Sequence, residues 1–199
     1  MCDSPETPRS PQTLKMGPLP IKESAIRTQN ISPITLEEIN EFAALQTRVD
    51  RKYIINAEMC NRLIEEVQVQ GRVLDIDGMR STIYQSIYFD TPNLDLYKDA
   101  AYKRRPRFKA RTRFYQQTNT AMLEVKTKDG RGKTIKKRTP YDVNDVDQLT
   151  TAGKTFIDNV IGEQGISHNL RATLTSHYQR TTIVDSGTST RITFDEYLT

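Results

Sequence analysis

Charged side chains recur at every second position in several strand-like segments of this 199-residue chain. The residues with this alternation are Arg48, Asp50 and Lys52; Lys109, Arg111 and Arg113; Glu124, Lys126 and Lys128; Lys136 and Arg138; and Arg191 and Asp195. In a β-strand, residues two apart point to the same face of the sheet. We expect these charged faces to meet in a sheet that closes into a barrel with a basic interior. Unpaired buried cations are too costly for a dry core, so this interior would hold water and a polyanion.

A central stretch concentrates much of the positive charge. From Lys103 to Arg138 there are fourteen lysines or arginines and two acids, Glu124 and Asp129, whereas the net charge of the whole chain is only +4. Such a local field concentrates anions. Cations two apart on a strand lie about 6–7 Å from each other and repel unless an anion lies between them. Guanidinium groups bind phosphate oxygens in a bidentate manner, so phosphate binding is favoured over an edge strand whose charge blocks aggregation.

Several of these residues have a second interpretation. Glu124 could pair with a cation or ligate a divalent metal that bridges to phosphate, and the ion pair is slightly favoured because one carboxylate is a weak metal signal. The segment around Arg48 fits an exposed strand face equally well. The run 136–138 also fits a solvated or nuclear-localisation-like basic surface, and His177 is interpreted as structural or exposed. The sequence has no Walker loop, Ser-His-Asp set or histidine metal cluster, so any chemistry would use charge stabilisation and metal assistance.

Helices and strands in succession would position these residues. Two helices have capping signals at their start, Thr35 with Glu38 and then Asn56. The expected helices are 36–46, 57–69, a short one at 94–101, and 144–162. The expected strands are 47–55, 81–89, 105–116, 120–129, 133–142, 172–184 and 190–197. The predicted fold class is α+β, an antiparallel β-barrel (tunnel) of about seven or eight strands with flanking helices.

The first part of the chain differs from the rest. Residues 1–30 are rich in Pro, Ser and Thr and lack periodicity, so a disordered N-terminal tail is predicted there. The two cysteines, Cys2 and Cys60, form no disulfide framework or zinc pattern. No apolar run approaches the roughly 20 residues that span a membrane, and the start lacks the hydrophobic core of a signal peptide. These features predict a cytoplasmic protein with no membrane segment in this chain.

Seven segments, taken in order, resemble the VTC domain. This is the polyphosphate polymerase domain of the vacuolar transporter chaperone complex and its bacterial relatives, within the CYTH-like triphosphate tunnel metalloenzymes. The resemblance spans about residues 34–199. The matching segments are RVDRKY at 48–53, SIYFDTP at 86–92, KARTRFY at 109–115, LEVK at 123–126, KKR at 136–138, YQR at 178–180 and RITFD at 191–195. Each segment is loose alone, but seven in the same order are specific.

The resemblance implies an eight-stranded antiparallel tunnel whose basic walls bind triphosphate or polyphosphate, with Mn²⁺ or Mg²⁺ held by carboxylates. Four residues would act directly in catalysis: Lys52, Arg111, Arg113 and Lys126. The further substrate-binding residues would be Arg48, Lys109, Lys128, Lys136, Arg138, Tyr178, Arg180 and Arg191. The metal-binding acids would be Glu124, Asp50 and Asp195.

Two departures from the family pattern bear on function. Arg48 stands where the adenylate cyclase and thiamine triphosphatase branch usually has a glutamate, which favours the polymerase branch and removes one metal ligand. The family usually continues past the 191–195 strand to a strand with a metal-binding glutamate, so the domain at 34–199 is expected to be C-terminally incomplete and to lack about one strand. We therefore expect ATP or polyphosphate binding with slow or lost turnover.

The expected activity is transfer of the γ-phosphoryl group of ATP to a polyphosphate chain. The alternatives are a triphosphatase that uses water as the acceptor, and a polyanion- or nucleic-acid-binding module without chemistry. Recognition of single-stranded nucleic acid calls for aromatic side chains among the cations. Here the intervening residues are Ala110, Thr112, Val125 and Thr127. The pattern therefore fits phosphate better than bases, and no nucleic-acid partner is expected.

Overall fold

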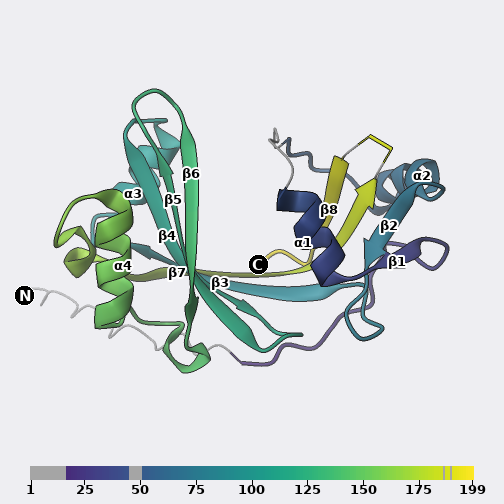
Figure 1. Cartoon of the computed structure of the whole chain (residues 1–199), viewed down its shortest axis with the longest axis horizontal. Coiled ribbons are helices and arrows are strands. Elements are labelled where there is room, and N and C mark those ends of the chain that lie inside the picture. Colours follow the sequence, from purple (N-terminus) through teal and green to yellow (C-terminus); the bar gives the residue numbers. More distant parts are fainter. Residues whose placement is uncertain (1–16, 45–50, 186, 189) are drawn as a thin grey trace, which may run out of the picture.

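One strongly curled sheet, mainly antiparallel, organises the chain, and helices cover parts of both its faces (Figure 1). The computed structural model describes residues 17–44, 51–185, 187–188 and 190–199. The strands are β1 (Ser32–Ile34), β2 (Gly71–Leu74), β3 (Thr82–Asp90), β4 (Arg107–Tyr115), β5 (Thr120–Lys128), β6 (Thr134–Tyr141), β7 (Arg171–Asp185) and β8 (Thr190–Glu196). The helices are α1 (Leu36–Ala44), α2 (Ala57–Val67), α3 (Asp95–Ala101) and α4 (Thr151–Ile161), with 3₁₀ turns η1 (Val143–Asp145) and η2 (Ile166–Asn169).

The long strand β7 joins the two halves of the sheet. The strand order is β1-β2-β7-β3-β4-β5-β6, and β8 pairs with the other edge of β7. Because β2 pairs with the end of β7 and β3 with its first ten residues, β2 and β3 lie end to end along one edge of it. Among the strands of the described residues, β1 and β2 are the one parallel pair. In Figure 1, β4, β5 and β6 form one wall, β8 and β2 form the other, and β3 with β7 crosses the base.

The sheet is curled but not closed. Among the described residues, β6 pairs only with β5, and β8 pairs only with β7. The register between β3 and β7 shifts between Tyr88 and Phe89, and an irregularity of this kind bends a strand and increases its twist. The result is a half-barrel with a concave face between the two walls (Figure 1).

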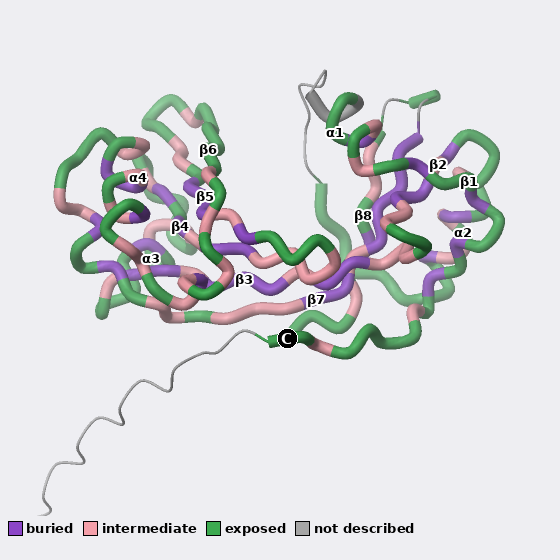
Figure 2. Tube along the Cα trace, turned by 60° about the horizontal axis from the view of Figure 1, so that its bottom comes forward, coloured by how far each residue is buried: buried purple, intermediate pink, exposed green. Residues whose placement is uncertain are grey.

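Apolar side chains of alternating strand residues form most of the core on the outer, convex face. Under α3 and α4 the largest cluster contains Ile87, Phe108, Leu123, Val125 and Ile157. A second cluster joins α2 to the same face. A third joins α1 to the concave face beside β2, since Val184 of this cluster shares a face with Tyr178 and Arg180. Figure 2 shows the buried residues following the strands, whereas hairpins and helix surfaces are exposed. The convex packing therefore leaves the concave face of β4, β5 and β6 free for polar side chains.

The helices begin and end where the sequence has capping residues. The hydroxyl of Thr35 accepts from the Glu38 amide while the Glu38 carboxylate accepts from the Thr35 amide, the reciprocal capping box. Asn56 caps α2 through the Met59 amide, and Thr150 caps α4 through the Gly153 amide. The α4 helix ends at Gly162, whose φ of 82° suits a residue without a side chain.

The predicted fold class is confirmed: the protein is α+β, with a curled antiparallel sheet and flanking helices. Two predictions of elements are wrong. The described part of the expected strand at 47–55, residues 51–55, forms no strand, and its remainder lies outside the described residues. The expected helix at 144–162 divides, because Asp142 caps the 3₁₀ turn and Thr150 starts a new helix. Strands β1 and β2 were not predicted.

The predicted tail at 1–30 lies only partly within the described residues. Residues 17–30 form no helix or strand, but backbone groups of this segment bond to side chains of the sheet. Leu19 exchanges two hydrogen bonds with the Gln116 amide, and Lys22 exchanges two with Gln179. Ile26 is buried in the cluster beneath α2.

Within the described residues, no helix combines the length and the apolar character that crossing a bilayer requires.

The convex core makes a first prediction. Ile157 of α4 is fully buried against the sheet, so Ile157→Ala should lower the free energy of unfolding by about 2–5 kcal/mol, measured by urea denaturation. Leu174 on β7 is 57% exposed, and Leu174→Ala should change it by under about 0.5 kcal/mol. Equal losses in the two variants would contradict this assignment of the core.

Candidate functional site

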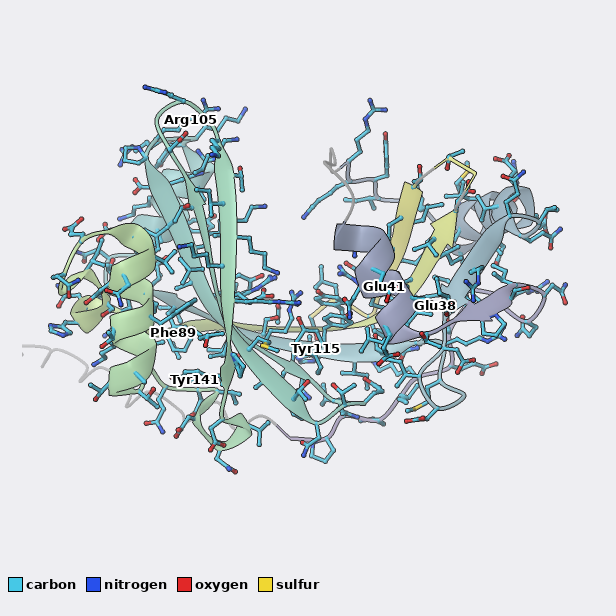
Figure 3. All side chains as sticks on the ribbon, viewed as in Figure 1. Glu38, Glu41, Phe89, Arg105, Tyr115 and Tyr141 are labelled. Carbon is cyan, nitrogen blue, oxygen red and sulfur yellow. The ribbon has the colours of Figure 1, made fainter. Side chains whose placement is uncertain are left out.

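The register of β4, β5 and β6 places the alternating charges on one face. Two cross-strand rows result: Lys109, Lys126 and Lys136 form one, and Arg111, Glu124 and Arg138 form the next. Residues directly opposite in paired strands share a face of the sheet. The intervening residues of β4 and β5 belong to the core under α4, so the two rows lie on the concave face. Figure 3 shows side chains of this wall extending toward the opposite wall.

Glu124 is the acid at the centre of these cations. Its side chain is 2% exposed, and its Oε2 accepts from Arg111 Nε and Nη2 at 2.8 and 2.6 Å. Its other oxygen, Oε1, accepts from Lys136 Nζ at 2.5 Å. Burial would raise the pKa of Glu124, but Arg111 and Lys136 outweigh it and hold that pKa below its usual value. The ion pair that the sequence favoured is therefore present, and both carboxylate oxygens are occupied by cations.

The pKa values of the two cations that bind Glu124 are shifted in opposite directions. Burial opposes the charge on Arg111, yet Tyr88 and Glu124 hold its pKa above the usual value. Arg111 Nη1 also donates to the Tyr88 hydroxyl at 2.9 Å. For Lys136, burial lowers the pKa more than the bond to Glu124 raises it, and the nearby arginines Arg111 and Arg113 add to the lowering. Arg111 therefore supplies a permanent charge, while the charge of Lys136 is the more easily lost.

Three cations of the two rows have no acidic partner in the described part of the chain. Lys109, Lys126 and Arg138 are exposed, and no described carboxylate forms an ion pair with any of them. Like charges directly opposite each other destabilise a sheet. An anion bound across Lys109 and Lys126 would remove that repulsion. This surplus of positive charge would favour an anion at the concave face.

A cluster of arginines and tyrosines lies on the same face nearer the base of the half-barrel. The rings of Tyr84 and Tyr178 stack with centroids 5.3 Å apart and planes 6° apart. The guanidinium of Arg113 lies 5.2 and 5.8 Å from the two ring centroids, and that of Arg180 lies 5.1 and 5.0 Å from them. Such cation–π contacts attract the guanidinium groups to the rings. Arg113 Nε also donates to Ser86 Oγ at 3.0 Å, so its position is well determined.

Arg180 at this cluster has an acidic partner. Its Nε and Nη2 donate to the two oxygens of Asp195 on β8 at 2.6 and 2.7 Å. Burial would lower the pKa of Arg180, but the bonds to Asp195 raise it above the usual value. Burial raises the pKa of Tyr178 although both arginines oppose it. Asp195 is thus an ion-pair partner, and Arg180 is less available to an external anion than Arg113.

The structure brings most of the predicted site residues to the concave face. Those whose register places them there are Lys109, Arg111, Arg113, Glu124, Lys126, Lys128, Lys136, Arg138, Tyr178, Arg180, Arg191 and Asp195. Lys52 is exposed in the non-strand segment 51–56, which places it on no wall of the sheet. Arg48 and Asp50 lie outside the described residues. The role of these residues in binding or transforming a substrate stays a prediction.

Sequence reasoning missed the tyrosines of β3 and β4 at the site. Tyr84, Tyr88 and Tyr115 lie on the same face as the arginines, and Tyr84 also packs edge-on against Tyr115 at 5.2 Å. Figure 3 shows Tyr115 at the base of the half-barrel. The two-residue spacing of Tyr84, Ser86 and Tyr88 is the signal that could have identified them, since it matches the spacing of the charged strands.

The described carboxylates do not make a metal site by themselves. Within the described residues, no group of three or more His, Cys, Asp or Glu side chains could hold a metal ion. Glu124 is bound by two cations and Asp195 by one, and they lie on different strands in different rows. Glu124 and Asp195, two of the three acids predicted to hold Mn²⁺ or Mg²⁺, therefore do not converge on one point. The third acid, Asp50, lies outside the described residues.

Comparison with known proteins decides the family. The profile of the VTC domain matches residues 47–199, most of the chain. The chain belongs to the VTC domain family. The matched region contains every strand of the concave face described above, from β2 to β8. No curated protein matches the chain.

Three of the solved structures that match part of the chain share low sequence identity with it. A candidate adenylate cyclase from Vibrio parahaemolyticus is 12% identical with a TM-score of 0.43, over 71% of this chain and 63% of that one. A candidate adenylyl cyclase from Hippeastrum, described as having a dominant triphosphatase activity, is 14% identical with a TM-score of 0.43, over 68% and 66%. A protein from Pyrococcus horikoshii is 16% identical with a TM-score of 0.37, over 67% and 63%. This VTC domain therefore spans less than two thirds of the length of these proteins.

The ion pairs of Glu124 make a prediction about stability and pH. At pH 7, Glu124→Gln should lower the free energy of unfolding by about 2–3 kcal/mol, because Arg111 and Lys136 lose their common counterion in a mostly buried position. The folded-state pKa of Glu124 is lowered. The stabilisation is therefore complete above the unfolded pKa of about 4.3 and is lost as the pH falls through the folded value.

Urea denaturation at successively lower pH measures this effect. The difference between the wild-type protein and Glu124→Gln should shrink in acid. The matched control is Glu58→Gln, which removes an exposed pair with Arg62 and should cost under about 1 kcal/mol. A difference that stays constant down to the acid-unfolding range would contradict the ionic role of Glu124.

Proposed function

We propose that this VTC domain binds the triphosphate of ATP, or polyphosphate itself, on its concave face, and transfers the γ-phosphoryl group of ATP to a polyphosphate chain. The observation that carries the proposal is the row of Lys109, Lys126 and Lys136 beside the row that contains Arg111 and Arg138. Together these rows present cations on three adjacent strands, with Glu124 as the acid between them. A linear polyanion provides regularly spaced charges for such a surface.

The roles of individual residues follow from how firmly each is held. Arg113 is buried and fixed by Ser86 and by two tyrosine rings, so it is preorganised to stabilise charge that develops on a transferring phosphoryl group. Arg111 is fixed by Glu124 and Tyr88. Lys126 and Arg138 are exposed and would hold the phosphates of the chain. Phosphoryl transfer requires mainly positioning and charge stabilisation, which these side chains supply.

Hydrolysis is the second candidate activity. Within the described residues, the outer edges of β6 and β8 pair with no further strand, so water could reach a phosphate bound to Lys126 or Arg138. A triphosphatase would use the same cations with water as the acceptor. A nucleic-acid-binding module is less favoured, because the row of Lys109, Lys126 and Lys136 contains no aromatic side chain. The rings of Tyr84 and Tyr178 on the same face already stack on each other and lie against Arg113 and Arg180. The need for Mn²⁺ or Mg²⁺ and the cytoplasmic location stay predictions.

Binding is tested with two neighbouring cations of β6 that occupy opposite faces of the sheet. Arg138 points to the concave face, whereas Lys137 has the opposite parity, and both are exposed. Arg138→Ala should weaken the binding of tripolyphosphate, measured by isothermal titration calorimetry, by about 1.4 kcal/mol, which is roughly tenfold. Lys137→Ala should leave the affinity within about twofold. Equal effects of the two variants would place the anion elsewhere.

The acceptor is tested with ATP labelled in the γ-phosphate, in the presence of Mn²⁺ and a polyphosphate primer. We expect slow transfer of label to polymer, separated from orthophosphate on a gel, and loss of this transfer in Arg113→Ala because the preorganised cation is removed. Label found only in orthophosphate would identify a triphosphatase. Tight binding of ATP with neither release nor transfer of the label would indicate a binding module without catalytic activity.

A further inference from the structure

The cationic face continues beyond the candidate site to the far end of the β4–β6 wall. In the next row Arg107 lies opposite Lys128. Beyond that row, the β5–β6 turn carries Arg131 and Lys133, and the loop before β4 carries Arg105. Figure 3 shows Arg105 at this end of the wall, far from the base where Tyr115 lies. We call the group of Arg105, Arg131 and Lys133 the distal cation group.

The loop and the turn that carry the distal cation group touch each other. A Cβ atom placed on Gly132 would lie 2.9 Å from Nη1 of Arg105, so the guanidinium rests against the backbone of the turn. Gly132 has a φ of 87°, a conformation that glycine adopts without strain. The close approach therefore depends on glycine at this position. It holds charges from two separate segments together as one surface.

Few acids offset these charges. Asp129 lies in the turn, and its carboxylate accepts from the Lys133 amide at 2.8 Å, which shapes the turn. Asp99 of α3 pairs with Arg104 at 3.4 Å. No described carboxylate forms an ion pair with Arg105, Arg131 or Lys133. The distal cation group is thus a positive surface that leads directly into the rows of the candidate site.

The length of this surface exceeds what a triphosphate can cover. From Arg113 to Arg107 along β4 the distance is about 20 Å at roughly 3.3 Å per residue, and the distal cation group lies beyond Arg107. A triphosphate bound at Arg113 and Lys126 would leave the distal cation group without an anion. Only a longer chain would reach it.

We propose that the distal cation group binds the far segment of a linear inorganic polyphosphate whose reacting end lies at Arg113. This inference rests on the proposed function and adds to it a preference for long chains over triphosphate. Additional ion pairs along one chain raise the affinity for long polymers without changing the contacts at the reacting end.

Inorganic polyphosphate fits this surface better than single-stranded nucleic acid. Bases need exposed aromatic faces on which to stack. Tyr102, at the end of α3, is exposed, but the guanidinium of Arg104 lies 5.3 Å from its ring centroid and occupies one face. The row next to the distal cation group consists of Arg107, Lys128 and Thr134, and none of these side chains is aromatic. Phosphate charge is what these groups recognise.

The test compares a long-chain polyphosphate with tripolyphosphate as probes of the 199-residue protein. A variant with Arg105→Ala, Arg131→Ala and Lys133→Ala should bind long-chain polyphosphate about tenfold more weakly, because three exposed ion pairs are lost, while its affinity for tripolyphosphate stays within about twofold. A second variant, Arg131→Ser with Lys133→Ser, leaves Arg105 in place in case that residue is needed for folding. It should weaken the binding of the long chain about threefold to fivefold. Lys137→Ala is the matched control on the outer face.

The outcomes separate this inference from the proposed function. Unchanged binding of the long chain in both distal variants would overturn the inference and leave tripolyphosphate binding at the candidate site intact. Failure of the wild-type protein to bind tripolyphosphate would overturn the proposed function instead. A single-stranded oligonucleotide that competes as well as a polyphosphate of similar charge would overturn the assignment of inorganic polyphosphate as the ligand. A distal variant that weakens both probes equally would also count against a separate distal site.

Discussion

Repulsion between cations on one concave face is the constraint on which the rest of this structure depends. Arg111, Lys136 and their neighbours lie on three adjacent strands, and Glu124 is the buried acid that holds two of them. Remaining charges such as Lys109 and Lys126 are left to solvent or to a ligand. Because like charges oppose the pairing of strands, the wall needs another source of stability. The apolar layer under α4, with Ile157 and Leu123 fully buried, provides it from the opposite side of the same strands.

The two faces of the wall therefore perform different tasks with the same backbone. Alternation along β4 sends Phe108 and Ala110 to the core and Lys109 and Arg111 to the concave face. The proposed ligand would leave the core undisturbed, since the charged residues of the concave face contribute little to apolar packing. Glu124 contributes to both faces, because it holds Arg111 in position on the concave face and balances charge that would destabilise the sheet.

The sequence was informative where the determining pattern is local. A period of two identifies the strand faces of β4, β5 and β6, and the capping residues Thr35, Asn56 and Thr150 lie directly beside the helices that they start. The alternation at 51–55 predicted a strand that does not form, because no partner strand pairs with it in the described residues. No sequence pattern predicted β1 and β2, which are three and four residues long and depend on pairing with distant segments. The stacking of Tyr84 on Tyr178 could not be predicted from the sequence either, because it depends on the pairing register of two strands that are far apart in the chain. The choice of Glu124 between a metal and a cation was left open for the same reason.

The fifteen-residue strand β7 runs through both halves of the half-barrel, pairing with β3 over one stretch and with β2 and β8 over another. The register shift at Tyr88 and Phe89 lies within its pairing with β3. Strand β7, with β3 paired to it, thus connects the wall of β4–β6 to the wall that contains β8. A change in the twist of this pair of strands would alter the separation of the two walls and would leave the hydrogen bonds within each wall in place. The width of the concave face is therefore set by the curvature of the strands that cross its base.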